Sequence, residues 1–115
     1  MCLFGASVPA AGYTPDSPEV QQMLDRAVPY LETKSGSVEM VGGKCLVALA
    51  LLKAGKDQTH PLVQEALAGA RKIAPVLVNT GGSGPCYNEA VACIFLCDVD
   101  PIQYAPEIKL LIQGM

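Results

Sequence analysis

The chain has 115 residues, about one domain, with a net charge of −3 and a hydrophobic content of 50%. Its mean hydropathy of +0.31 is high, yet aromatic residues make up only 5% and tryptophan is absent, so leucine, alanine, valine and isoleucine have to build the core. The lack of a basic stripe argues against a nucleic-acid partner, and no apolar run reaches the roughly 18 residues of a membrane span.

The N-terminal segment, residues 1–14, is expected to lie outside the domain formed by residues 15–115. Residues 1–11 are apolar and rich in small side chains, and Val8-Pro9-Ala10 has the form of a signal-peptidase site. An export signal also needs a basic start, which is absent here. This favours a loosely packed arm on a cytoplasmic protein; the alternative is a truncated signal peptide on an exported one.

The first helix is expected to start near Pro18, with Ser17 or Asp16 as its cap. Pro29 is expected to kink this helix or to end it early. The spacing of its apolar residues predicts a one-sided amphipathic helix, the stripe being Val20, Met23, Leu24, Ala27, Val28 and Leu31.

Two further helices are expected to be apolar on all sides. The first spans residues 43–55, where every residue between Lys44 and Lys53 is apolar and Gly55 is placed to end the helix. The second spans residues 87–97, after a Gly- and Ser-rich loop at residues 79–85 and before a break at Asp98-Val99-Asp100-Pro101. A helix without a polar face has to be covered all round.

The two remaining helices are striped. His60-Pro61 opens the third helix, which Pro75 is expected to end near residue 74, and the last runs from Pro106 through Ile112. The third helix has a polar, solvent-exposed face of Gln64, Glu65, Arg71 and Lys72, and an inner face of Leu62, Val63, Ala66, Leu67, Ala70 and Ile73.

The helices repeat with a period near 44 residues. Pro18, Pro61 and Pro106 each open a striped helix with a β-branched residue two positions later, and they lie 43 and 45 residues apart. The two all-apolar helices overlay at an offset of 44, which places Ala48 on Ala92. The predicted fold is therefore all-α: about two and a half α/α hairpin units, with apolar helices inside and striped helices outside, stacked as a solenoid or a partial α/α-toroid.

In this pattern, over about residues 17–113, the chain resembles the prenyltransferase and squalene-oxidase repeat of α/α-toroid proteins, the fold of terpenoid cyclases such as squalene–hopene cyclase. It departs from that family in having no Trp for the Gln…Trp motif, and in Asp98-Val99-Asp100-Pro101, which ends in Pro where the Asp-x-Asp-Asp acid motif has Asp. The resemblance implies a short or fragmentary bacterial relative. One reading is a non-catalytic module that associates with further α/α repeats or with itself. The other is a partial or degenerate cyclase or prenyltransferase relative that binds an isoprenoid, an apolar small molecule.

The resemblance also indicates where a ligand would lie. In toroids the ends of inner helices face the central cavity, which singles out Cys86, Tyr87, Asn88 and Glu89 at the start of the second apolar helix. A Cys at a helix N-terminus can have a lowered pKa, but no His or Cys lies at a spacing that would complete a catalytic pair or a zinc site. The alternative is that these residues serve capping and packing. No catalytic residue, cofactor or metal is therefore predicted.

The other polar motifs have structural interpretations. Asp98 and Asp100 form a weak cation site and are better explained as a helix stop with Asp100 capping the next turn. The glycine clusters at residues 42–45 and 81–84 are interpreted as flexible turns rather than phosphate loops. His60, the only histidine, is expected to cap the third helix. The five cysteines, Cys2, Cys45, Cys86, Cys93 and Cys97, are interpreted as buried core thiols, which suits a reducing compartment.

Overall fold

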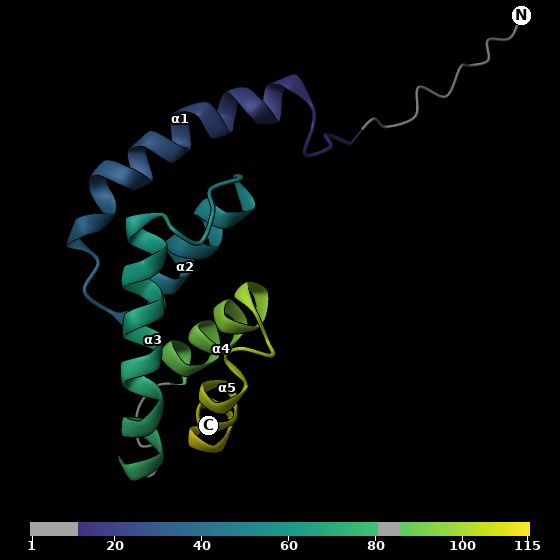
Figure 1. The fold of residues 1–115 in the computed structure, drawn as a ribbon. Coiled ribbons are helices and arrows are strands. Elements are labelled where there is room, and N and C mark those ends of the chain that lie inside the picture. The colour runs from purple at the N-terminus through teal and green to yellow at the C-terminus, as the bar shows by residue number, and fades with distance from the viewer. Residues whose placement is uncertain (1–11, 81–85) are drawn as a thin grey trace, which may run out of the picture.

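The computed structural model describes residues 12–80 and 86–115, and of residues 77–80 the backbone only. Over these residues the chain forms five α-helices and one short 3-10 helix, without a strand, which confirms the predicted all-α class (Figure 1). The helices are α1 (Pro18–Lys34), α2 (Val41–Lys53), α3 (Pro61–Thr80), α4 (Tyr87–Val99) and α5 (Ala105–Gly114), with the 3-10 helix η1 (Ser35–Ser37) between α1 and α2. The predicted N-terminal signal or arm at residues 1–11 lies outside the described residues.

Helix α1 starts as predicted but continues further. Pro18 lies in its first turn and Ser17 at the N-cap, although the Ser17 side chain makes no cap bond; its Oγ instead accepts a hydrogen bond from the Thr14 N–H at 2.9 Å. The helix runs through Pro29, so the predicted early end is wrong. Water can solvate the carbonyl that Pro29 leaves without a donor, because this part of α1 is exposed.

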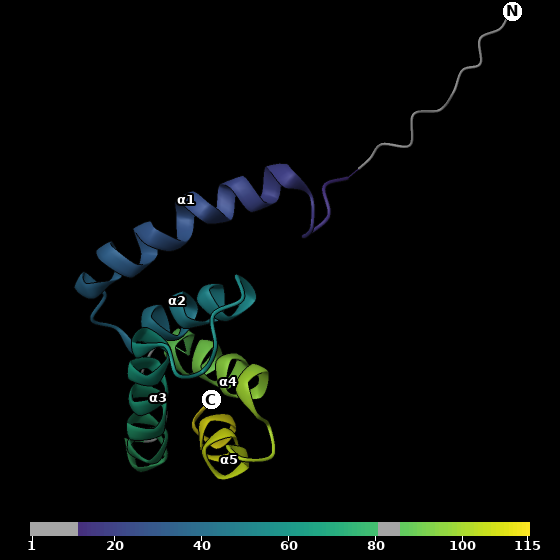
Figure 2. The same cartoon turned by 45° about the horizontal axis from the view of Figure 1, so that its top comes forward.

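The apolar stripe of α1 is only partly packed against the rest of the protein. No residue of α1 is buried, and Met23 and Tyr30 are 69% and 65% exposed. Only Val28 and Leu31 pack against the core from this helix. Figures 1 and 2 show α1 lying to one side of the other four helices, joined to them through η1.

Helix α2 ends as the sequence predicts. Ala54 is the C-cap and Gly55 follows with φ of +97°, a conformation that favours glycine. The Gly55 N–H donates to the Leu52 carbonyl and the Lys56 N–H to the Leu51 carbonyl, the pair of bonds that defines a Schellman motif. The prediction that α2 is covered all round is wrong: the exposed fraction of Leu46 is 53%, although Gly42, Cys45, Ala48 and Leu51 of the same helix are buried.

Helix α3 is longer than predicted, because it continues through Pro75 to Thr80. The predicted end near Ala74 is therefore wrong. The loop predicted at residues 79–85 is also wrong for residues 79 and 80, which are helical, and residues 81–85 are not described. The predicted inner face is confirmed, with Val63, Ala66 and Ala70 fully buried. Ala74, just before Pro75, is buried as well, whereas Pro75 and Val76 are exposed, so burial is observed up to the proline and the helix itself continues beyond it.

The four helices α2 to α5 pack into a common core. Helix α2 contacts both α3 and α4, and α5 contacts both α3 and α4 (Figure 2). Helices α2 and α4 run in the same direction, since Gly42 contacts Asn88 near their starts and Lys53 pairs with Asp98 near their ends. The buried apolar residues are Cys45, Ala48, Leu51, Val63, Ala66, Leu67, Ala70, Ala74, Ala92, Phe95, Leu96, Tyr104 and Leu111. Five alanines among them allow close helix approach.

Candidate functional site

The first turn of α4 holds the four residues predicted to face a ligand. Cys86 takes the N-cap position without a side-chain cap bond and is exposed, as is Tyr87. Asn88 reaches across to α2, where its Oδ1 accepts a hydrogen bond from the Gly42 N–H at 2.9 Å. Because Met40 at the N-cap of α2 has no capping side chain, Asn88 satisfies one of the free N–H groups of that helix. Capping and packing thus account for Asn88, and the ligand-facing role stays a prediction.

Glu89 is the one charged residue that the described core buries. Only 3% of it is exposed, and its Oε2 atom has no hydrogen-bond partner. It lies in the first turn of α4, and the start of α2 is adjacent through the Gly42–Asn88 bond. The starts of the two parallel helices α2 and α4 therefore lie close together at this residue. Sequence reasoning placed Glu89 at the helix start but gave no signal that it is buried.

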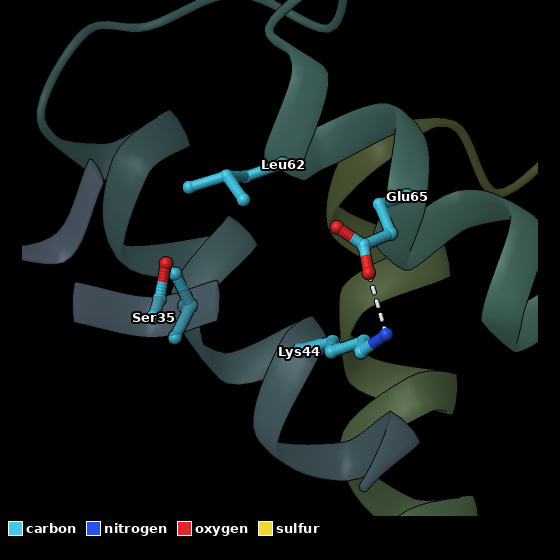
Figure 3. A pocket seen from close by; sticks show the side chains of 5 residues that line it. Ser35, Lys44, Leu62 and Glu65 are labelled. Carbon is cyan, nitrogen blue, oxygen red and sulfur yellow. Dashed lines mark hydrogen bonds and ion pairs between the residues drawn. The ribbon is translucent and has the colours of Figure 1, made fainter. Parts of the chain in front are cut away.

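A small pocket between η1, α2 and α3 brings together polar residues that sequence reasoning missed. It is lined by Ser35, Lys44, Val47, Leu62 and Glu65 and has a volume of about 10 Å³, the space of about one water molecule. Ser35 Oγ is buried there without a partner. Figure 3 shows the Lys44 ammonium turned toward Glu65, 2.5 Å from its Oε1, and not toward Ser35. The arrangement therefore does not supply a lysine base for a serine nucleophile.

The C-terminal half of α1 is tied to the α2–α3 connection by Glu32. Its Oε1 lies 3.0 Å from His60 Nε2 and 3.2 Å from Lys56 Nζ. The hydrogen bond with His60, and then that with Lys56, lowers the pKa of the Glu32 carboxyl. His60 Nδ1 accepts a hydrogen bond from the Leu62 N–H at 3.3 Å, which confirms the predicted capping role of the histidine.

A groove of about 320 Å³ lies between α1 and the end of α2. Its lining combines apolar and charged side chains: Gln21, Leu24, Asp25, Val28, Pro29, Glu32, Ala54 and Lys56. No aromatic side chain lines it, and two carboxylates do. The groove therefore offers no specific support for binding of an isoprenoid.

The acidic and glycine-rich motifs have structural roles where they are described. Asp98 pairs with Lys53 at 2.6 Å, and Asp100 Oδ1 accepts bonds from the N–H groups of Ile102 and Gln103, both at 2.9 Å, so Asp100 caps the turn as predicted. In the described part of the chain, no cluster of three or more His, Cys, Asp or Glu residues is arranged to hold a metal ion. The glycines at residues 42 and 43 lie within α2, so their interpretation as a flexible turn is wrong; residues 81–84 lie outside the described residues.

The prediction that the cysteines are core thiols holds for only one of the four that are described. Cys45 is fully buried, which raises the pKa of its thiol to about 12. Cys86 and Cys97 are exposed and Cys93 is half-buried. Burial, followed by the neighbouring Cys97, raises the pKa of the Cys93 thiol. Cys2 lies outside the described residues.

The three partly or fully exposed thiols share one face of α4. Cys86, Ala90, Cys93, Ile94 and Cys97 recur at spacings of four, three, one and three, so they form one stripe of the helix. We call these five residues the outer face of α4. None of them carries a charged side chain, none is buried, and Ile94 is 60% exposed. The all-apolar sequence of α4 indicated burial here, and no local signal showed which side would stay uncovered.

Within the described residues, no helix combines the length and the apolar character needed to cross a membrane. No protein-family model matches the chain, and no curated protein or solved structure shows significant similarity to it.

Proposed function

We propose that the protein is a non-catalytic helical-repeat module that acts by association, with a further α/α unit packing on the outer face of α4. The observation that carries this proposal is the exposure of that uncharged face on a helix whose other sides are packed. An exposed apolar stripe on an otherwise buried helix is typical of an interaction surface. The resemblance to toroid repeats, in which each unit covers the one before it, points to the same kind of partner.

The repeat relates the outer face of α4 to a face of α2. At the predicted offset of 44 residues, Cys86 and Cys97 of α4 correspond to Gly42 and Lys53 of α2. Gly42 and Lys53 are the residues through which α2 meets α4, by the hydrogen bond to Asn88 and the ion pair with Asp98. The other residues of the outer face of α4 correspond to Leu46, Leu49 and Ala50 of α2, of which Leu46 and Ala50 are exposed. The two apolar helices therefore leave equivalent faces open, and these faces meet at their two ends through the Asn88 and Asp98 contacts.

The uncovered end extends beyond α4. Ile102, just before α5, is 87% exposed, and Ile112 on α5 is 55% exposed. A partner with an inner and an outer helix would cover both α4 and α5, whereas a single helix would cover only one. Stable interfaces bury on the order of 800 Å² on each partner, which one helix face alone does not provide.

For this chain on its own, the available partner unit is a second copy. We expect light scattering over a tenfold or wider range of protein concentration to show self-association. Ile94→Glu, which places a charge on the outer face of α4, is expected to shift the chain to the monomer. Met23→Glu on α1 is the matched control, because Met23 is exposed to a similar extent, 69% against 60% for Ile94, and Figure 1 shows α1 apart from α4.

Two outcomes would contradict the proposal. A wild-type chain that stays monomeric at every concentration would show that the chain does not self-associate. A chain that still associates with Ile94→Glu in place would show that the outer face of α4 is not the interface. Turnover of a radiolabelled prenyl diphosphate would instead overturn the non-catalytic assignment and favour the cyclase or prenyltransferase alternative.

A further inference from the structure

Two thiols of α4 lie close enough to act together. Cys93 and Cys97 are one helical turn apart, which puts their Cβ atoms about 5–6 Å from each other. The Cys97 thiol is also close enough to contribute to the raised pKa of the Cys93 thiol. Cys97 is exposed and Cys93 half-buried, so the pair is open to solvent on one side and held by a packed helix on the other.

Two carboxylates near the Cys93–Cys97 pair in sequence are already paired or buried. Asp98, next to Cys97, is paired with Lys53, and Glu89, one turn before Cys93, is buried. Cys86 is on the same stripe but seven residues before Cys93, about 10 Å along the helix axis. Cys45 is fully buried in the core. The local donor set therefore consists of two sulfur atoms.

The number of donor atoms and their softness determine which metal ion a pair of thiols can bind. Structural zinc takes four ligands, and hard cations such as Mg²⁺ and Ca²⁺ take oxygen. Soft thiolate ligands favour Cu(I), for which two of them suffice in a linear arrangement. With metal–sulfur bonds of about 2.3 Å, the two sulfur atoms would lie roughly 4.6 Å apart, which Cβ atoms one helical turn apart allow.

We propose that Cys93 and Cys97 form a two-coordinate site for Cu(I). One Cu(I) ion binds two thiolates, two protons leave the thiols, and the oxidation states of copper and sulfur do not change. Because the thiols have to lose their protons, binding strengthens as the pH rises. The site lies within one chain, but the proposed association would cover Cys93 and Cys97, so the titration is carried out at a protein concentration at which the chain is monomeric.

The test is an anaerobic titration of the whole chain with Cu(I) in competition with bicinchoninate, a chromophoric chelator. Cys2 is replaced by Ser in every protein, so that the described cysteines alone compete. We expect one Cu(I) per chain, loss of this binding in Cys93→Ser and in Cys97→Ser, and retention of it in Cys86→Ser and Cys45→Ser. Circular dichroism of each variant shows whether it is folded, and only folded variants are compared.

Equal binding by all four variants, loss on Cys86→Ser, or one Cu(I) per two chains would overturn the intrachain pair. Repeating the titration in the Ile94→Glu variant separates the two proposals. Copper binding by a monomeric Ile94→Glu variant supports the site independently of association, whereas a monomeric Ile94→Glu variant that binds no copper overturns the site and leaves the association standing.

Discussion

At Gly42 the α2 backbone lies close to α4, and Gly42→Ala tests that approach. A Cβ atom at this position would lie 2.7 Å from Asn88 Oδ1, 2.8 Å from Tyr87 Cε1 and 3.1 Å from the Asn88 Cα. The last of these is backbone, so a side-chain rotation of Asn88 or Tyr87 cannot relieve every contact. The hydrogen bond from the Gly42 N–H to Asn88 would be disturbed as well.

The magnitude follows from opposing contributions. Alanine favours a helix interior by up to about 1 kcal/mol over glycine. Overpacking typically costs about 1–3 kcal/mol, and a lost hydrogen bond costs roughly 1 kcal/mol more. The steric and hydrogen-bond losses outweigh the helix propensity, so we expect Gly42→Ala to lower the free energy of unfolding by about 1–3 kcal/mol.

Gly69→Ala in α3 is the matched control. Its Cβ would lie 3.7 Å from both methyl groups of Val41, an ordinary van der Waals contact. There the helix propensity of alanine acts without a clash, so we expect a gain of about 0.5–1 kcal/mol. Urea unfolding followed by circular dichroism measures both variants. The reasoning would be refuted by a Gly42→Ala variant as stable as Gly69→Ala, because that result would mean that the α2 and α4 backbones are not in close contact.

Two other predictions concern the core and the attachment of α1. Val63 is fully buried, so Val63→Asp should destabilise the fold by about 3–5 kcal/mol through an unpaired buried charge, whereas Lys72→Asp on the exposed face of α3 should change little; equal melting temperatures would remove Val63 from the core. The pKa of Glu32 is lowered from its ordinary value of 4.5, chiefly by His60, so its ionised form stabilises the folded chain above pH 4.5 and this contribution is lost as the pH falls through the lowered pKa. Glu32→Gln should therefore be less stable than the wild type at pH 7 and approach it on acidification, and a stability difference that stays constant with pH would exclude the ion pairs as its source.

Local signals in the sequence determined where α1, α3 and α5 start and where α2 and α4 end. Pro18, Pro61 and Pro106 each fall in the first two positions of a helix, and Gly55 and Asp100 mark helix ends. These residues act on the backbone within about one turn, through a fixed φ, a positive φ or a side-chain cap. The buried face of α3 was predictable for a related reason, since a polar stripe on one side of a helix shows which side packs.

Only the tertiary structure decided how the apolar helices are covered and which polar groups are buried. A helix that is apolar on all sides has no stripe, so its sequence does not show that α2 and α4 each leave one face open. Asn88 caps α2 from a position 46 residues away, and Glu89 is buried where two helix starts converge. Local signals also gave no indication that α3 continues past Pro75. Burial and pairing depend on neighbours that are distant in the chain, and local patterns carry no record of them.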